Sequence, residues 1–128
     1  MKMKMIEAIN IKNVLGNFVN TQLPISFSYK VMKFITSVEA EEQFFNEKLK
    51  GLIDQYSEKD DNGVPVMTSQ QSFKIQKDKE KECGDKVKEL ENIEIETFDF
   101  KITLKDLEEM DLKVAPKDLY ILSPIIEE

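Results

Sequence analysis

The chain has 128 residues, a length that fits one domain with a single modest core. It is 41% hydrophobic and 34% charged, and its apolar runs all fall short of the roughly 20 residues that cross a bilayer, so no membrane segment is expected. All 18 basic residues are lysine, and the sequence has no histidine and no tryptophan. The absence of histidine and arginine excludes catalytic triads, zinc hydrolase sites and arginine fingers.

The net charge of −7 is distributed unevenly along the chain. Residues 1–34 carry five lysines and one acid, whereas residues 91–128 carry eleven acids and four lysines. A domain that binds DNA or RNA through its phosphates is normally basic, so direct nucleic-acid binding is disfavoured. The acidic end fits a basic partner, or simply serves solubility.

The N-terminus and the cysteine content predict a cytoplasmic protein. Lysines begin the chain, but no long apolar stretch or small-residue cleavage site follows them, so export is not expected. Cys83 is the only cysteine, which rules out an intramolecular disulfide and fits a reducing compartment. We expect Cys83 to be a small buried residue on a helix face, with a reactive thiol as the alternative.

The N-terminal half predicts a strand and two helices. Alternating Met and Lys over residues 1–6 predict a short strand, or equally a frayed start. Apolar positions at helical spacing predict a short helix from Ile9 to about residue 20, and a long helix over residues 27–56 that is interrupted at Glu41 and Glu42. At about 1.5 Å per residue the long helix would exceed what a compact domain needs, so part of it must project, bend or pack against a partner.

A turn and a second helix follow the long helix. Residues 58–72 are polar, contain Asn62-Gly63 and predict an exposed loop or a short hairpin. A second helix is predicted from residue 73 or 77 to residue 91, packed antiparallel on the long helix to form a helical hairpin. Gly84 lies inside this helix, which suggests a kink or a close helix approach.

The C-terminal part predicts a strand and short helices. Two-residue alternation over residues 93–104 changes phase near Glu96-Thr97, which predicts a strand with a bulge that pairs with residues 1–6. Thr103 and Asp106 have the spacing of a capping box, and Pro116 fits the first turn of another helix. The apolar residues after Pro124 are expected either to enter the core or to form a sticky end.

These elements predict an α+β fold that is mainly α: a long helical hairpin with a small two-stranded antiparallel or mixed sheet and short C-terminal helices. We expect a single domain over residues 1–128. Its predicted parts are a strand, a short helix and the long helix (1–57), an exposed loop (58–72), the second hairpin helix (73–91), and a strand with short helices (92–128).

Five segments resemble a family of short phage and prophage proteins of unknown function from low-GC Gram-positive bacteria. They are LPISFSYK (23–30), LIDQYSEKDDNG (52–63), VKELENIEI (87–95), ITLKDLE (102–108) and LYILSPIIEE (119–128). The resemblance covers nearly the whole chain and brings no catalytic motif. It implies a phage protein that acts in virion assembly or in takeover of the host.

Two binding functions are consistent with these features, both with another phage or host protein as the partner. In the first, a virion accessory or morphogenesis factor uses the long helix and the acidic C-terminal region; Phe44, beside Phe45 and off the main apolar stripe, is the candidate contact, and homo-oligomers are possible. In the second, carboxylates mimic phosphates and block a nucleic-acid channel of a host nuclease or defence complex. The candidate carboxylates are Glu91, Glu94, Glu96, Asp99, Glu108, Glu109 and Asp111.

Catalysis is the least favoured function. Its only chemistry would be a carboxylate pair holding magnesium, either Asp60 with Asp61 or Glu41 with Glu42. Adjacent acids of this kind are usually solvated. We therefore expect no enzyme activity, no cofactor and no metal, and a protein of the host bacterial cytoplasm that either joins the virion or remains outside it.

Overall fold

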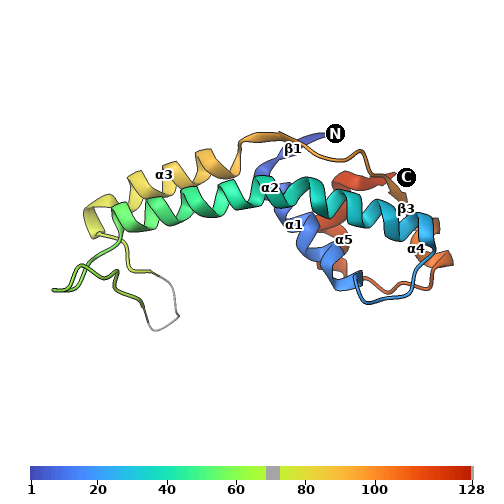
Figure 1. Cartoon of the computed structure of the whole chain (residues 1–128), viewed down its shortest axis with the longest axis horizontal. Coiled ribbons are helices and arrows are strands. Elements are labelled where there is room, and N and C mark those ends of the chain that lie inside the picture. The colour runs from blue at the N-terminus through green and yellow to red at the C-terminus, as the bar shows by residue number, and fades with distance from the viewer. Residues whose placement is uncertain (69–72, 128) are drawn as a thin grey trace. The chain divides into compact units, whose positions relative to one another are not determined.

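A computed structural model of the chain describes residues 1–68 and 73–127 (Figure 1). The fold is α+β and mainly α, as predicted. The elements in chain order are β1 (Lys2–Lys4), α1 (Met5–Leu15), a 3-10 turn (Gly16–Phe18), α2 (Ile25–Tyr56), a 3-10 turn (Lys77–Lys79), α3 (Glu80–Glu91), β2 (Glu94–Glu96), β3 (Ile102–Thr103), α4 (Leu104–Glu109), α5 (Pro116–Leu122), a 3-10 turn (Ser123–Ile125) and β4 (Ile126–Glu127).

The contacts within the chain divide it into two compact units. Unit 1 consists of Met1–Glu42 with Glu94–Glu128, and unit 2 consists of Gln43–Ile93. Helix α2 contributes residues to both units. The expectation of a single domain stays a prediction.

Helix α1 forms the centre of unit 1 and contacts α5. Its side chains are buried around most of the helix: Met5, Ala8, Ile9, Ile11, Val14 and Leu15. It begins at Met5, earlier than the predicted start at Ile9. The Glu7 carboxylate accepts a hydrogen bond from the Lys4 backbone amide at 3.3 Å, which satisfies an otherwise free donor at the helix start. The predicted strand is therefore limited to Lys2–Lys4.

The predicted pairing of the N-terminus with the segment after α3 is confirmed. Strands β1 and β2 are antiparallel, with Met3 opposite Ile95, and both of these side chains are buried. The pairing ends at Thr97, whose backbone amide donates to the Met1 carbonyl oxygen at 2.7 Å. The predicted strand over residues 93–104 is wrong in its length, because the chain leaves the ladder at the position where its apolar phase changes and forms β3 separately.

The C-terminus closes the core of unit 1. Strand β4 pairs with β3 in parallel, with Ile102 opposite Ile126, and Ile125 is fully buried. The tail therefore enters the core, which was one of the two predicted outcomes. Helix α4 begins at the predicted capping box, in which the Asp106 amide donates to Thr103 Oγ1 at 3.0 Å and the Thr103 amide donates to Asp106 Oδ2 at 3.1 Å.

Unit 2 is the helical hairpin predicted from the sequence, formed by the second half of α2 and the antiparallel helix α3 (Figure 1). Its few buried residues, among those described, are Phe45, Tyr56, Ser57, Cys83 and Leu90. Gly84 in α3 has no neighbouring atom within 4 Å of the position that a Cβ would take, so the suggested close approach of another helix at this residue is wrong.

Three short extended stretches, 57–59, 65–67 and 73–75, form an arm that joins the two helices of unit 2. Antiparallel bridges link Ser57 to Ile75, Lys59 to Pro65 and Met67 to Phe73. The turn between the first two stretches is held by Asp60 Oδ1, which accepts hydrogen bonds from the amides of Asn62 and Val64, and Gly63 adopts a positive φ of 76°. The hairpin alternative for residues 58–72 is thus observed over the described residues, while 69–72 lie outside them.

Candidate functional site

A groove of about 650 Å³ lies on the hairpin of unit 2, between α2 and α3. Its lining combines apolar residues with four charged ones. The lining residues are Phe44, Glu47, Lys48, Gly51, Leu52, Gln55, Lys86, Glu89, Leu90 and Ile93. A groove lined by both apolar and charged residues is typical of a site that binds an amphipathic helix.

Phe44 is the most prominent apolar side chain of this groove. It is 42% exposed, whereas its neighbour Phe45 is buried, with 8% exposed. Lys48, one turn further along α2, places Nζ 5.6 Å from the centroid of the Phe44 ring, within the range of a cation–π interaction. The structure therefore leaves Phe44 available for contact, and its role in binding a partner stays a prediction.

Gly51 has no side chain and therefore leaves an open space, or hollow, on the same helix face. It lies seven residues after Phe44, so both residues project from one side of α2, and both line the groove. No atom lies within 4 Å of the position that a Cβ of residue 51 would occupy. An aromatic projection and a hollow are thus arranged two turns apart along one helix.

The charges at the groove balance each other. Glu47 and Lys48 come from α2, and Lys86 and Glu89 come from α3. Each helix thus contributes one acid and one base, although the chain as a whole carries a net charge of −7. This groove therefore favours a partner surface with both signs of charge over a uniformly basic one.

Helix α3 of the hairpin contains the single cysteine of the sequence, and this residue is buried. Cys83 is 7% exposed, and burial raises the pKa of its thiol above the ordinary value. Both properties oppose thiolate formation, so the expected structural role of Cys83 agrees with its position and the reactive-thiol alternative does not. Tyr56 lies nearby: burial raises the pKa of its hydroxyl, and so do a hydrogen bond to Glu82 and the negative charge of that residue.

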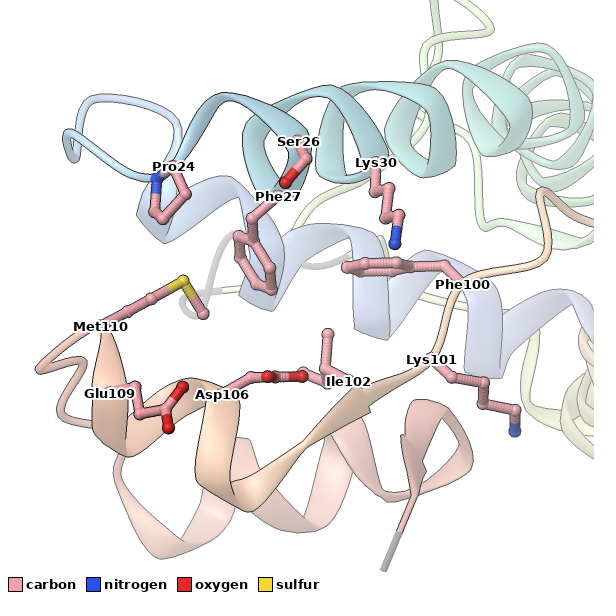
Figure 2. A pocket seen from close by; sticks show the side chains of 10 residues that line it. All are labelled: Pro24, Ser26, Phe27, Lys30, Phe100, Lys101, Ile102, Asp106, Glu109 and Met110. Atoms are coloured by element: carbon pink, nitrogen blue, oxygen red, sulfur yellow. The ribbon is translucent and has the colours of Figure 1, made fainter.

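A second pocket, of about 320 Å³, lies in unit 1 between α2 and α4 (Figure 2). The rings of Phe27 and Phe100 meet edge to face there, with centroids 5.9 Å apart. Charged side chains also line it, but most of them have intramolecular partners. Lys101 Nζ donates to the Pro124 carbonyl oxygen, Asp106 caps α4, and Glu109 pairs with Lys105 at 3.8 Å. These three groups are therefore engaged in interactions within unit 1.

The acids proposed as phosphate mimics lie on several elements. Glu91 belongs to unit 2, and the others belong to unit 1. Glu96 is paired with the N-terminal ammonium at 3.0 Å and Glu94 with Lys2 at 3.9 Å, so both charges on β2 are partly neutralised. Asp99, Glu108 and Asp111 are exposed, the last with a positive φ of 54° at the end of α4. Figure 1 shows β1, and with it the paired strand β2, well apart from α4 within unit 1.

The two carboxylate pairs considered for magnesium also have structural roles. Asp60 holds the turn of the arm, and Glu42 is paired with Lys12 at 2.6 Å. Within residues 1–68 and 73–127, no group of three His, Cys, Asp or Glu side chains is arranged to hold a metal ion. Across the same described ranges, no helix is both long enough and apolar enough to cross a membrane.

Comparisons of the chain with protein-family models, with curated proteins and with solved structures found no match. The resemblance to phage proteins therefore stays a prediction from the sequence. The sequence identified Phe44, but it did not identify Gly51, the four charged residues of the groove or Ile93. The seven-residue spacing from Phe44 to Gly51 places both residues on one helix face and was the available signal. The spacing alone does not show that α3 lies beside this face and completes the groove.

Proposed function

We propose that this is a non-enzymatic protein that acts by binding another protein, and that the groove of unit 2 is the binding surface. The observation that carries the proposal is the exposed aromatic residue Phe44, which lies in a groove bordered by charges of both signs. Aromatic side chains at the centre of an interface contribute much of the binding free energy when they are desolvated.

The poor burial within unit 2 supports this proposal. Unit 2 comprises Gln43–Ile93, and only a few of its described residues are buried. Phe44 and Ile93 are 42% and 40% exposed at the groove, where they would be covered by a partner. A segment of about 50 residues that buries so little gains stability when a further element covers its apolar face.

An amphipathic helix is the occupant that fits this surface. Its apolar side chains would contact Phe44, Leu52 and Ile93, and its flanking residues would need both acidic and basic groups. The absence of histidine and arginine from the sequence, together with the intramolecular partners of the unit 1 pocket, supports binding over catalysis.

The resemblance to phage proteins supplies a setting, in which the protein would serve as a morphogenesis or virion accessory factor. Mimicry of nucleic acid by the acidic residues has less support. Glu94 and Glu96 are already paired with cations, and the groove itself is not acidic.

The proposal is tested by capture with the tagged full-length chain and its Phe44→Asp variant. Lysate of infected host cells and purified virions are used as sources, and the captured proteins are identified by mass spectrometry. Tyr120→Asp is the matched control, because Tyr120 is an aromatic residue that is 81% exposed and does not line the groove. We expect partners to bind the wild type and the control and to be lost with Phe44→Asp. Equal capture by all three chains would contradict the groove as the binding surface.

A further inference from the structure

We infer that the helix occupying this groove is α2 of a second copy of the chain, so that the protein forms a two-fold symmetric dimer through unit 2. The inference rests on the proposed function, because it names the partner for the same surface. It depends on the order of four residues along α2, because this order is complementary to the same order in an antiparallel second copy.

The four residues Phe44, Glu47, Lys48 and Gly51 define this arrangement. Glu47 and Lys48 are adjacent, and Phe44 and Gly51 lie three residues beyond this pair on either side. All four line the groove, so they share one face of α2. The order along α2 is therefore aromatic ring, acid, base and hollow. When a second α2 helix runs antiparallel to the first, the ring lies opposite the hollow and the acid lies opposite the base.

A two-fold axis places the complementary members of this order opposite one another. In a two-fold symmetric interface, residue i of one copy contacts residue j of the other, and j contacts i. If two α2 helices cross antiparallel with the axis between residues 47 and 48, Glu47 meets Lys48 of the second copy twice. In the same register Phe44 of each copy lies over Gly51 of the other, where no atom occupies the space of a side chain.

The remaining groove residues agree with this pairing. Lys86 and Glu89 on α3 also combine a base with an acid on adjacent turns of one helix, so a second copy meets charges of both signs there too. The groove has no net charge, which removes the local repulsion expected from two chains that each carry −7. Two hairpins stacked in this way would form a four-helix arrangement that covers Phe44 and Ile93.

The first measurement is the mass of the full-length wild-type chain by sedimentation equilibrium, from about 1 to 100 μM. A monomer has a mass of 14.9 kDa, and we expect a concentration-dependent shift to twice this value. A wild-type protein that remains monomeric over this range overturns the dimer. Loss of captured partners with Phe44→Asp would then still support the proposed function, so the two ideas can fail separately.

Charge exchange tests the register. Glu47→Lys alone and Lys48→Glu alone each place like charges opposite one another twice, so both variants should dimerise about tenfold more weakly. Mixing the two variants should restore association as a heterodimer, and the double variant Glu47→Lys with Lys48→Glu should restore the homodimer. A misfolded variant would not be rescued in this way. Dimers that are unaffected by the single changes, or that are not rescued by either combination, would overturn the reciprocal pairing.

The two glycines of the hairpin helices give a matched test of the hollow. Gly51 and Gly84 both have open space where a Cβ would be, but only Gly51 lines the groove. We expect Gly51→Leu to fill the space required by Phe44 and to weaken the dimer at least tenfold, whereas Gly84→Leu leaves its dissociation constant unchanged. Equal effects of the two substitutions would contradict the position of Phe44 over Gly51.

Discussion

The ammonium of Lys12 lies 2.6 Å from a carboxylate oxygen of Glu42, and this pair connects the last turn of α1 to α2 within unit 1. The two side chains are only 21% and 20% exposed. Glu42 occupies a position where the helical spacing called for an apolar residue. The charge is retained there because it neutralises a half-buried lysine, so the apparent interruption of the stripe is itself a contact.

We expect Glu42→Ala to lower the free energy of unfolding by about 1–3 kcal/mol, since it leaves the Lys12 ammonium half-buried without its partner. Urea unfolding of Glu42→Ala, Lys12→Ala and the double variant measures the coupling between the two residues. Lys105→Ala is the control, because its pair with Glu109 is 82% and 63% exposed and should contribute less than about 1 kcal/mol. Equal losses for the half-buried and the exposed pair would show that the burial of Lys12 and Glu42 adds nothing.

The cap of α4 provides a second prediction for unit 1. Thr103→Ala removes the side-chain oxygen that accepts from the Asp106 amide at 3.0 Å and should cost about 1 kcal/mol. Thr103→Ser keeps this acceptor and should lose much less. The midpoint of urea unfolding distinguishes the two variants. If both lower it equally, the methyl group of Thr103 matters and the cap does not.

Short-range chemistry made several elements predictable. The capping box of α4, the turn at Gly63 and the first-turn proline of α5 depend on residues within one or two turns of each other, and the structure contains all three. The pairing of β1 with β2 was also predictable, because only one segment of matching alternation was available to the N-terminus.

The features that were not predicted from the sequence depend on packing between segments that are distant in the chain. The start of α1 at Met5 depends on a fully buried environment built from distant segments, and β3 separates from β2 because it pairs with the C-terminal strand β4. In the candidate site, Phe44 was identifiable from its place beside Phe45. The contribution of α3 to the groove depends on the register between two helices, which helical periodicity alone does not fix.

Unit 2 should lose stability in alkaline solution. The pKa of Tyr56 is raised above its ordinary value of 10.0, and that of Cys83 above 9.0, both mainly by burial. The folded state therefore holds these protons more tightly than the unfolded state, so the stabilisation is complete below the ordinary pKa values and is lost as the pH rises through the raised ones. We expect the urea midpoint to fall between about pH 9 and pH 11.

Tyr56→Phe isolates the tyrosine part of this effect. The variant should show a shallower decline of the urea midpoint above about pH 10, because no phenol remains to ionise. Tyr29→Phe is the matched control, since Tyr29 is 54% exposed and its replacement should leave the decline unchanged. The same steep decline in all three proteins would mean that the burial of Tyr56 does not contribute to the pH dependence.

Replacement by alanine should have opposite effects on stability at two glycines of unit 2, Gly84 and Gly63. Gly84 lies within α3 with open space at its Cβ position, so Gly84→Ala should stabilise the protein by about 1 kcal/mol through the higher helix propensity of alanine. Gly63 has the same open space but a φ of 76°, so Gly63→Ala should destabilise by about 1 kcal/mol, because a β-carbon is strained in the left-handed region. Thermal and urea unfolding of both variants measure the difference. Destabilisation by Gly84→Ala would mean that α3 needs its glycine for a reason other than space, such as a bend of the helix at that residue.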